Sequence, residues 1–300
     1  MAKNIFYQFQ TSIEQSMCLN GDKHSIKKTD TSDHRIFSFA SRKELINFSH
    51  LFADYMKKEF PEVRKVKNIN VEHINSFLGS RTGVTQATIN HYVACINKLE
   101  KCCEKTFRIN VDWKTDRQVP NLQQAEKLRS AVFSEKQIAK LKEYLSTRKD
   151  CYSKSAFYIA ERFSLRSAEI TAIKVKDVNI DSGILHIHES KGKRSRDIEM
   201  TKSDIEFMKK MIEGKEKNER LIPLKSDSIC AYLSRCCRHL NFENIISSKS
   251  SYHALRKATI RRYYKEKIKE VGEKKAREMA LQRLGHGSRR SDLEKIYLFD

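Results

Sequence analysis

Apolar side chains recur every three or four residues along most of the chain, and this spacing predicts a largely helical protein. The clearest stripe starts near Ser41 and runs to about Glu59, where Pro61 would end a helix. Two more stripes follow, and Thr85 is a suitable N-cap for the second of them. These stripes predict a helical bundle over residues 41–110. Its expected inward residues are Leu45, Phe48, Phe52, Tyr55, Met56, Val71, Ile74, Phe77, Leu78, Ile89, Tyr92, Val93, Ile96 and Leu99.

The segments on either side of this bundle are less regular. Residues 1–40 are poorly patterned, and we treat them as an N-terminal extension in which residues 5–7 could open a short helix. Residues 111–131 are polar and lack periodicity, which predicts an interdomain linker. A second domain should then cover residues 132–300, starting with a capping box formed by Ser134 and Gln137.

Helical spacing gives way to alternation between Asp177 and Met200. A strand over residues 184–188, a turn over residues 190–193 and a returning strand over residues 196–200 predict a β-hairpin. The expected fold class is therefore mainly α with a small antiparallel β-sheet, in two domains. The hairpin is loaded with positive charge, which is either a solvated turn or a finger that enters a groove of DNA. The basic residues are Lys191, Lys193, Arg194 and Arg196.

Charge points to the class of partner. The chain has 300 residues with 59 Lys and Arg against 38 Asp and Glu, a net charge of +21, which favours a polyanion. No run of about 18 apolar residues and no signal-peptide core is present, so nucleic acid is favoured over a membrane surface. Lys98, Lys101 and Lys105 lie on the last predicted helix of the bundle, as a solvated face or as contacts to the DNA backbone.

The eight cysteines form no C-x-x-C pair, and without a secretion signal they are expected to be reduced and packed as small apolar groups. Zinc is disfavoured because the ligand spacing is wrong. His186 and His188 are expected to be residues of a strand face rather than metal ligands. These features predict a cytoplasmic, nucleoid-associated protein with no metal.

The last fifth of the chain holds the candidate chemistry. His253 and Arg256 are three apart and lie on one face of a predicted helix, so both can reach one ligand group. His286 and Tyr297 follow, and such a set could hold, protonate and attack a phosphodiester without a metal. Further upstream, a helix break near Ser164 precedes Arg166 and Glu169, which form either a structural ion pair or a ligand-binding guanidinium held by its carboxylate.

Taken in order, these motifs resemble the tyrosine recombinase (phage integrase) family. The resemblance covers about residues 130–300 and rests on six positions that occur in the order and approximate spacing of the family pattern. They are Arg166 with Glu169, Lys191 in a β-turn, His253-x-x-Arg256, Leu284-Gly285-His286 and Tyr297. The helical bundle resembles, less specifically, the core-binding domain of that family.

The resemblance implies a role for each residue. Tyr297 would be the nucleophile that forms a 3′-phosphotyrosyl link, while Arg166 and Arg256 would bind the non-bridging phosphate oxygens. Lys191 would protonate the 5′ leaving oxygen, with Lys193 as the alternative acid. The other implied roles are those of His253 and His286, which would bind the phosphate and help to move the phenol proton, and of Glu169, which would orient Arg166. Tyr263 and Tyr264 continue the helix of His253 and are expected to pack.

The implied function is site-specific DNA recombination, for integration or excision of a mobile element. The alternatives are a type IB topoisomerase-like nicking and closing enzyme and a non-catalytic DNA-binding regulator on the same scaffold. The implied partners are double-stranded DNA sites, a homotetramer on DNA and accessory DNA-bending proteins, with no cofactor. Two departures from the family stand out: His286 and Tyr297 are slightly further apart than is common, and no helix is expected after Tyr297.

Overall fold

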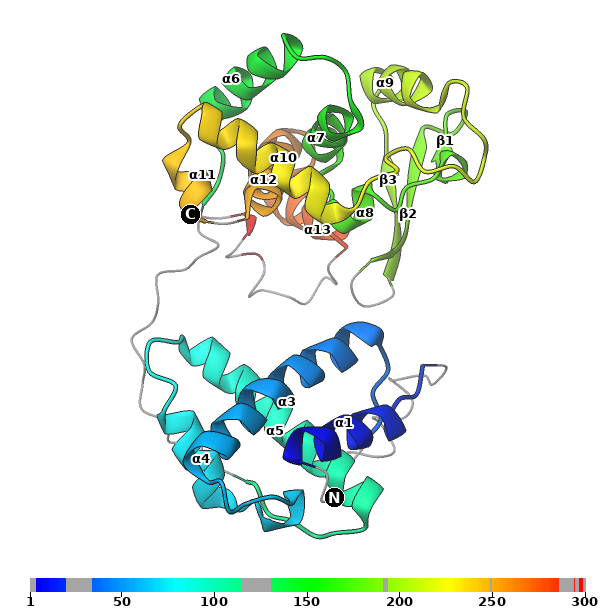
Figure 1. Cartoon of the computed structure of the whole chain (residues 1–300). Helices are drawn as coiled ribbons and strands as arrows, with labels where there is room; N and C mark the ends of the chain where they lie inside the picture. Colours follow the sequence, from blue (N-terminus) through cyan, green and yellow to red (C-terminus); the bar gives the residue numbers. More distant parts are fainter. Residues whose placement is uncertain are drawn as a thin grey trace. The chain divides into compact units, whose positions relative to one another are not determined.

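The computed structural model describes residues 4–19, 34–114, 131–190, 194–248, 250–285, 294 and 297–298. The chain divides into two compact units, Met1–Glu126 and Lys127–Asp300, and we describe each by itself (Figure 1). No helix among the described residues is both long and apolar enough to span a bilayer.

The first unit is a bundle of helices around an aromatic core. Its helices are α1 (Ile5–Gln15), α3 (Phe39–Glu59), α4 (Val71–Gly79) and α5 (Gln86–Phe107), with a short 3-10 turn η1 (Val66–Asn68). Thr85 caps α5 as predicted, since its side chain accepts a hydrogen bond from the Thr88 amide. Phe52 and Phe77 are fully buried and in edge contact, with ring centroids 5.0 Å apart. The predicted stripe residues other than Val71 and Ile89 therefore belong to the core cluster of this unit or pack against it.

Two segments outside the predicted bundle also belong to this core. Helix α1 packs on α3 and α5, because Ile5, Phe9 and Ile13, each four residues apart, are buried along one of its faces. Trp113, which the sequence analysis placed in the linker, is fully buried. Its indole Nε1 donates to the Ile69 carbonyl at 3.0 Å. The first unit thus includes parts of both flanking segments.

Helices also make up most of the second unit. They are α6 (Glu135–Ser146), α7 (Tyr152–Phe163), α8 (Ser167–Ile170), α9 (Lys202–Ile212), α10 (Ser226–His239), α11 (Glu243–Ser247), α12 (Ser251–Val271) and α13 (Glu273–Arg283). The predicted capping box opens α6: Ser134 Oγ accepts from the Gln137 amide at 3.1 Å, and the Gln137 side chain accepts from the Ser134 amide at 3.0 Å. Helix α12 packs against α7, α10, α11 and α13, so its residues reach the centre of the unit.

A three-stranded antiparallel sheet completes the second unit, which confirms the predicted fold class. Its strands, in the order β1-β2-β3, are β1 (Val178–Asn179), β2 (Ile184–Ser190) and β3 (Arg194–Glu199), preceded by the 3-10 turn η2 (Val175–Asp177). Figure 1 shows the strands side by side at one edge of the unit. Leu185 pairs with Ile198, and Ile187 pairs with Arg196, so the inward face of the hairpin includes one arginine.

Candidate active site

Glu169 is the centre of a buried ionic cluster in the second unit. Its carboxylate accepts from Arg166 Nη1 at 2.8 Å and from Arg196 Nη2 at 2.9 Å, and it lies 3.4 Å from Arg256 Nη1. We call Arg166, Glu169, Arg196 and Arg256 the Glu169 cluster. Three positive charges face one negative charge, so the cluster holds an excess of two positive charges. Such an excess in a buried place favours binding of an anion.

The local backbone explains how Arg166 and Glu169 come together. Helix α7 ends at Phe163. The next residue, Ser164, has a left-handed conformation (φ 54°, ψ 40°) that terminates the helix, where the sequence predicted a helix break. Helix α8 then starts after Arg166, and Glu169 accepts from the Arg166 backbone amide at 2.9 Å. The side chain of Arg166 remains one-quarter exposed while that of Glu169 is buried. The predicted ion pair is therefore formed, on an arginine whose side chain remains partly exposed.

Burial opposes a charge on Glu169, but the hydrogen bond from Arg196 and the nearby charge of Arg256 outweigh it and lower the carboxyl pKa to about 2. Glu169 is therefore ionised at neutral pH. Burial also lowers the pKa of Arg256 to about 9, and the charge of Arg166 acts in the same direction.

Arg256 lies on α12 and is almost fully buried. Its Nη2 donates to the Leu284 carbonyl at 2.7 Å, which ties α12 to the end of α13. Its Nε is also buried and has no hydrogen-bond partner among the described residues. A buried donor of this kind is costly to leave unsatisfied, so it points to a missing acceptor.

Tyr297 lies next to this cluster. Its ring is buried, 6.0 Å from the Arg256 guanidinium carbon, and its ring centroid is 5.4 Å from that of His253 in an edge arrangement. Arg261 Nε donates to the Tyr297 carbonyl at 3.2 Å, which fixes the backbone at this position. The structure thus places Tyr297 beside His253 and Arg256, although the sequence predicted these residues from separate motifs.

Arg196 is the member of the cluster whose role the sequence analysis missed. It was counted among the charges of the hairpin, as a solvated or DNA-facing residue, and that interpretation is wrong for this position. The side chain is only 5% exposed and forms a bidentate salt bridge with Glu169. Its position two residues before Ile198, on the same buried face of β3, was the available signal.

Several predicted site residues lie outside what the structure describes: Lys191, Lys193 and His286, together with the side chain of Arg194. Lys98 does not extend freely from α5, because its ammonium donates to the Arg35 carbonyl at 2.8 Å. Lys101 is half-buried and Lys105 is exposed on the same helix.

Other residues singled out in the sequence, two tyrosines, two histidines and the cysteines, lie outside the Glu169 cluster. Tyr264 is buried and Tyr263 packs beside it, as predicted for a structural pair. His188 bonds to Asp177 at 2.8 Å, and His186 bonds to Asp197 across the hairpin. In the part of the chain that the structure describes, no group of three or more potential ligands could hold a metal ion. The cysteines are free thiols, and five of the eight are buried.

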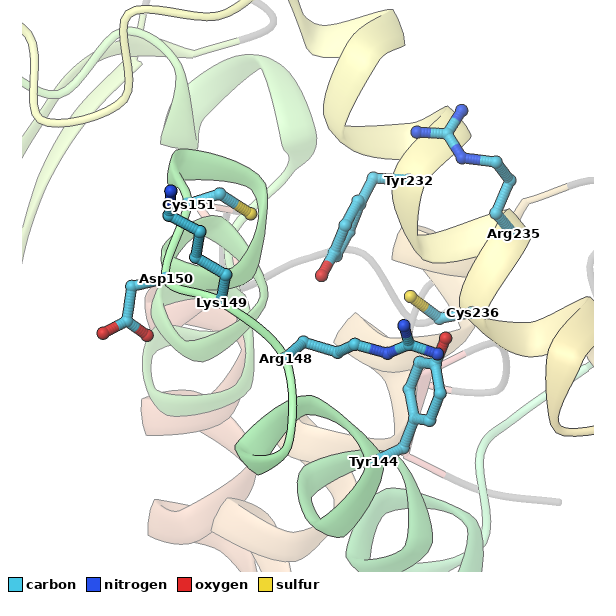
Figure 2. A pocket seen from close by; sticks show the side chains of 8 residues that line it. All are labelled: Tyr144, Arg148, Lys149, Asp150, Cys151, Tyr232, Arg235 and Cys236. Atoms are coloured by element: carbon cyan, nitrogen blue, oxygen red, sulfur yellow. The ribbon is translucent and has the colours of Figure 1, made fainter.

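A separate pocket of about 540 Å³ lies between α6, α7 and α10. Figure 2 shows Tyr232 and Cys236 projecting from α10 toward Arg148 and Tyr144. Arg148 lies over the Tyr144 ring, 4.6 Å from its centroid. This pocket shares no residue with the Glu169 cluster, so the candidate chemistry does not depend on it.

Comparisons with solved structures show what the whole chain resembles. An integrase of the Tn1549 transposon, solved with transposon right-end DNA, matches with a TM-score of 0.62 at 13% identity, covering 99% of this chain and 96% of that one. The XerH site-specific recombinase, bound to a palindromic difH substrate, matches with a TM-score of 0.64 at 16% identity, covering 99% and 91%. A lambda integrase dimer bound to a core site matches with a TM-score of 0.55 at 15% identity, covering 93% and 81%.

These identities are low, so the structural matches establish the fold alone. A search of curated proteins finds no match. The family model described as "Phage integrase family" matches residues 131–286, which is more than half of the chain and contains the Glu169 cluster and His253. The chain therefore belongs to the phage integrase family, the tyrosine recombinases.

Proposed function

We propose that the protein is a site-specific DNA recombinase that cuts and rejoins DNA through a 3′-phosphotyrosyl intermediate, in the integration or excision of a mobile element. One observation carries the proposal: an excess of buried guanidinium charge lies beside a phenol and an imidazole. Cleaving a phosphodiester requires a nucleophile, cations that stabilise developing negative charge, and an acid for the leaving oxygen. The second unit supplies candidates for each.

In this proposal, the Tyr297 oxygen forms a bond to the scissile phosphorus, and the bond to the 5′ oxygen breaks. The phenol proton passes to a neighbouring base, for which His253 is the candidate among the described residues, assisted by His286. Lys191 gives a proton to the departing 5′ oxygen. Because the phosphotyrosyl link conserves the energy of the phosphodiester, the reverse reaction rejoins DNA without ATP.

The guanidiniums stabilise the transition state. Arg256 would offer its buried Nε to a non-bridging phosphate oxygen, and Arg166, whose side chain is one-quarter exposed, would bind a second oxygen. Planar guanidinium groups match phosphate geometry in a way that an ammonium does not. Glu169 would hold both arginines in place as their charges meet the phosphate.

Double-stranded DNA is the proposed partner. The net charge of +21 supports it, and the three solved structures described above contain DNA. The first unit would act as a core-binding domain through the basic side of α5, with Lys101 and Lys105 as candidate contacts. The proposed assembly is a homotetramer on two DNA sites, aided by DNA-bending proteins, in the nucleoid of the cytoplasm.

A nicked suicide duplex that carries the DNA flanking the gene would test the proposal. On such a substrate the short leaving strand diffuses away, so the covalent adduct accumulates and is counted on a denaturing gel. The wild type should form the adduct, whereas Tyr297→Phe should bind the same DNA and form none. Tyr263→Phe, a change to a neighbouring packed phenol, is the matched control and should retain the adduct.

An adduct that persists in Tyr297→Phe would contradict the assignment of the nucleophile. Absence of any adduct with the wild type, together with retained DNA binding, would favour a regulator. Efficient relaxation of a supercoiled plasmid without target sites would favour a topoisomerase.

A further inference from the structure

Arg196 connects three segments of the second unit with a single guanidinium. Its Nη1 and Nη2 donate to the two oxygens of Glu169 at 3.1 and 2.9 Å. Its Nε donates to the Arg283 carbonyl at 2.8 Å, at the end of α13. The residue itself lies on β3, opposite Ile187 of β2. Three of its N–H donors are therefore directed at two other elements.

Each of these segments carries or adjoins a candidate catalytic residue. Glu169 also holds Arg166 and Arg256. Strand β3 begins at Arg194, three residues after Lys191 in the sequence. The Arg283 carbonyl is followed by Leu284 and Gly285, directly before His286 in the sequence.

Gly285 provides a second observation at the same place. A Cβ atom built on Gly285 would lie 2.9 Å from Arg196 Nη1 and 3.4 Å from its Cδ and Cζ atoms. The backbone at Gly285 is also in the left-handed region, with φ +71°. The chain after α13 thus passes directly against the Arg196 side chain, where only a glycine fits without displacing it.

We propose that Arg196 is a positioning residue for the recombination site, which rests on the function proposed above. It fixes strand β3 and the end of α13 to the carboxylate that holds Arg166 and Arg256. The geometry explains why the residue is an arginine. A lysine keeps the charge but cannot donate to two carboxylate oxygens and a carbonyl from one rigid plane.

Two readouts on the full chain test this proposal. The first is the single-turnover rate of adduct formation at saturating nicked duplex, measured beside the DNA affinity. For Arg196→Met and Arg196→Lys, we expect the rate to fall by about 10- to 100-fold. Losses of this size are typical when a residue is removed that orients a ligand-binding side chain through a hydrogen bond. The DNA affinity should not change. The second readout is hydrogen exchange of backbone amides, which we expect to speed up in three places at once: β3, α8 and the turn at residues 284–285.

Arg162→Met is the matched control. Arg162 is an arginine of the same unit that is 29% exposed, is paired with Asp204 at 2.8 Å and does not contact Glu169 among the described residues. Its loss should remove a buried-end ion pair without slowing adduct formation. A thermal melt of each variant separates this general destabilisation from an effect on the site.

A double-mutant cycle completes the test. If Arg196 acts through Glu169, Arg196→Met should slow adduct formation much less in a Glu169→Gln background than in the wild type. Fully additive rate effects, an adduct rate that Arg196→Met leaves unchanged, or exchange that increases in β3 alone would each overturn the inference. Failure of the proposed function would be recognised differently, because the wild type would then form no adduct. In that case the hydrogen exchange of β3, α8 and residues 284–285 alone decides whether Arg196 holds these segments together.

Discussion

Two buried glutamates of the second unit hold cations, yet only one of them lies in the candidate active site. Glu161 accepts from Lys142 at 2.8 Å and from Arg262 at 2.7 Å. Arg262 also lies 3.6 Å from Glu135, so two positive charges meet two negative ones and the group is neutral. The Glu169 cluster instead has three positive charges on one carboxylate.

Exposure separates the two groups as clearly as charge does. The cations on Glu161 are 42% and 32% exposed, whereas those on Glu169 are 25%, 5% and 1% exposed. Water can therefore solvate the partners of Glu161, and that group is a structural brace. The arginines around Glu169 have little water to neutralise their excess charge. A buried carboxylate by itself thus does not indicate function. An excess of buried positive charge around that carboxylate does.

The largest expected effect comes from removing each carboxylate in turn. Glu169→Gln leaves three guanidiniums facing one another without a counterion, and should lower the free energy of unfolding by about 3–5 kcal/mol. Glu161→Gln frees cations that water can solvate, and should cost about 1 kcal/mol. Urea denaturation followed by far-UV circular dichroism measures both values.

Trp113 provides an internal control for this comparison, because it is the single tryptophan of the chain and is buried in the first unit. Its fluorescence reports on that unit, while both variants change the second. The tryptophan transition should therefore stay in place for both variants if the units unfold independently. Equal losses of stability from the two substitutions would contradict the distinction between the groups.

The sequence could pair the described candidate residues because their motifs are local. Spacing of three residues joined Arg166 to Glu169 and His253 to Arg256, and a helix turn fixes such pairs without knowledge of the tertiary fold. Arg196 was missed because β3 has one buried and one exposed face, and its charge was assigned to the exposed one.

The elements missed in the first unit have a similar cause. Trp113 lies in a polar stretch without helical periodicity, and its burial involves a contact with Ile69, far away in sequence. Helix α1 did have a signal, in the spacing of Ile5, Phe9 and Ile13, but it is short and separated from the other helices by a polar stretch. Long-range contacts of this kind cannot be inferred from periodicity alone.

A second pair of substitutions compares two of the arginines of α12, Arg256 and Arg262, for catalysis. Arg256→Lys replaces a buried guanidinium, which can donate two hydrogen bonds in one plane, by an ammonium. It should slow single-turnover adduct formation by about 10²- to 10³-fold with DNA binding largely retained. Arg262→Lys keeps a solvated cation near Glu161 and should react like the wild type. A comparable slowing in Arg262→Lys would mean that the rate loss reflects a weakened α12 rather than a lost phosphate contact.

The smallest expected effect is the difference in acid sensitivity between the two glutamates. The folded pKa of Glu169 is about 2, below its usual value of 4.5, so its contribution to stability is complete above the higher value and lost as the pH falls toward the lower. Between about pH 5 and about pH 3, this group should account for about 2 kcal/mol of the loss in unfolding free energy. Glu169→Gln should lack that part of the loss, while Glu161→Gln should keep it. Urea titrations of the three proteins at several pH values measure the slopes, and parallel slopes for the wild type and Glu169→Gln would show that Glu169 is not held ionised by its arginines.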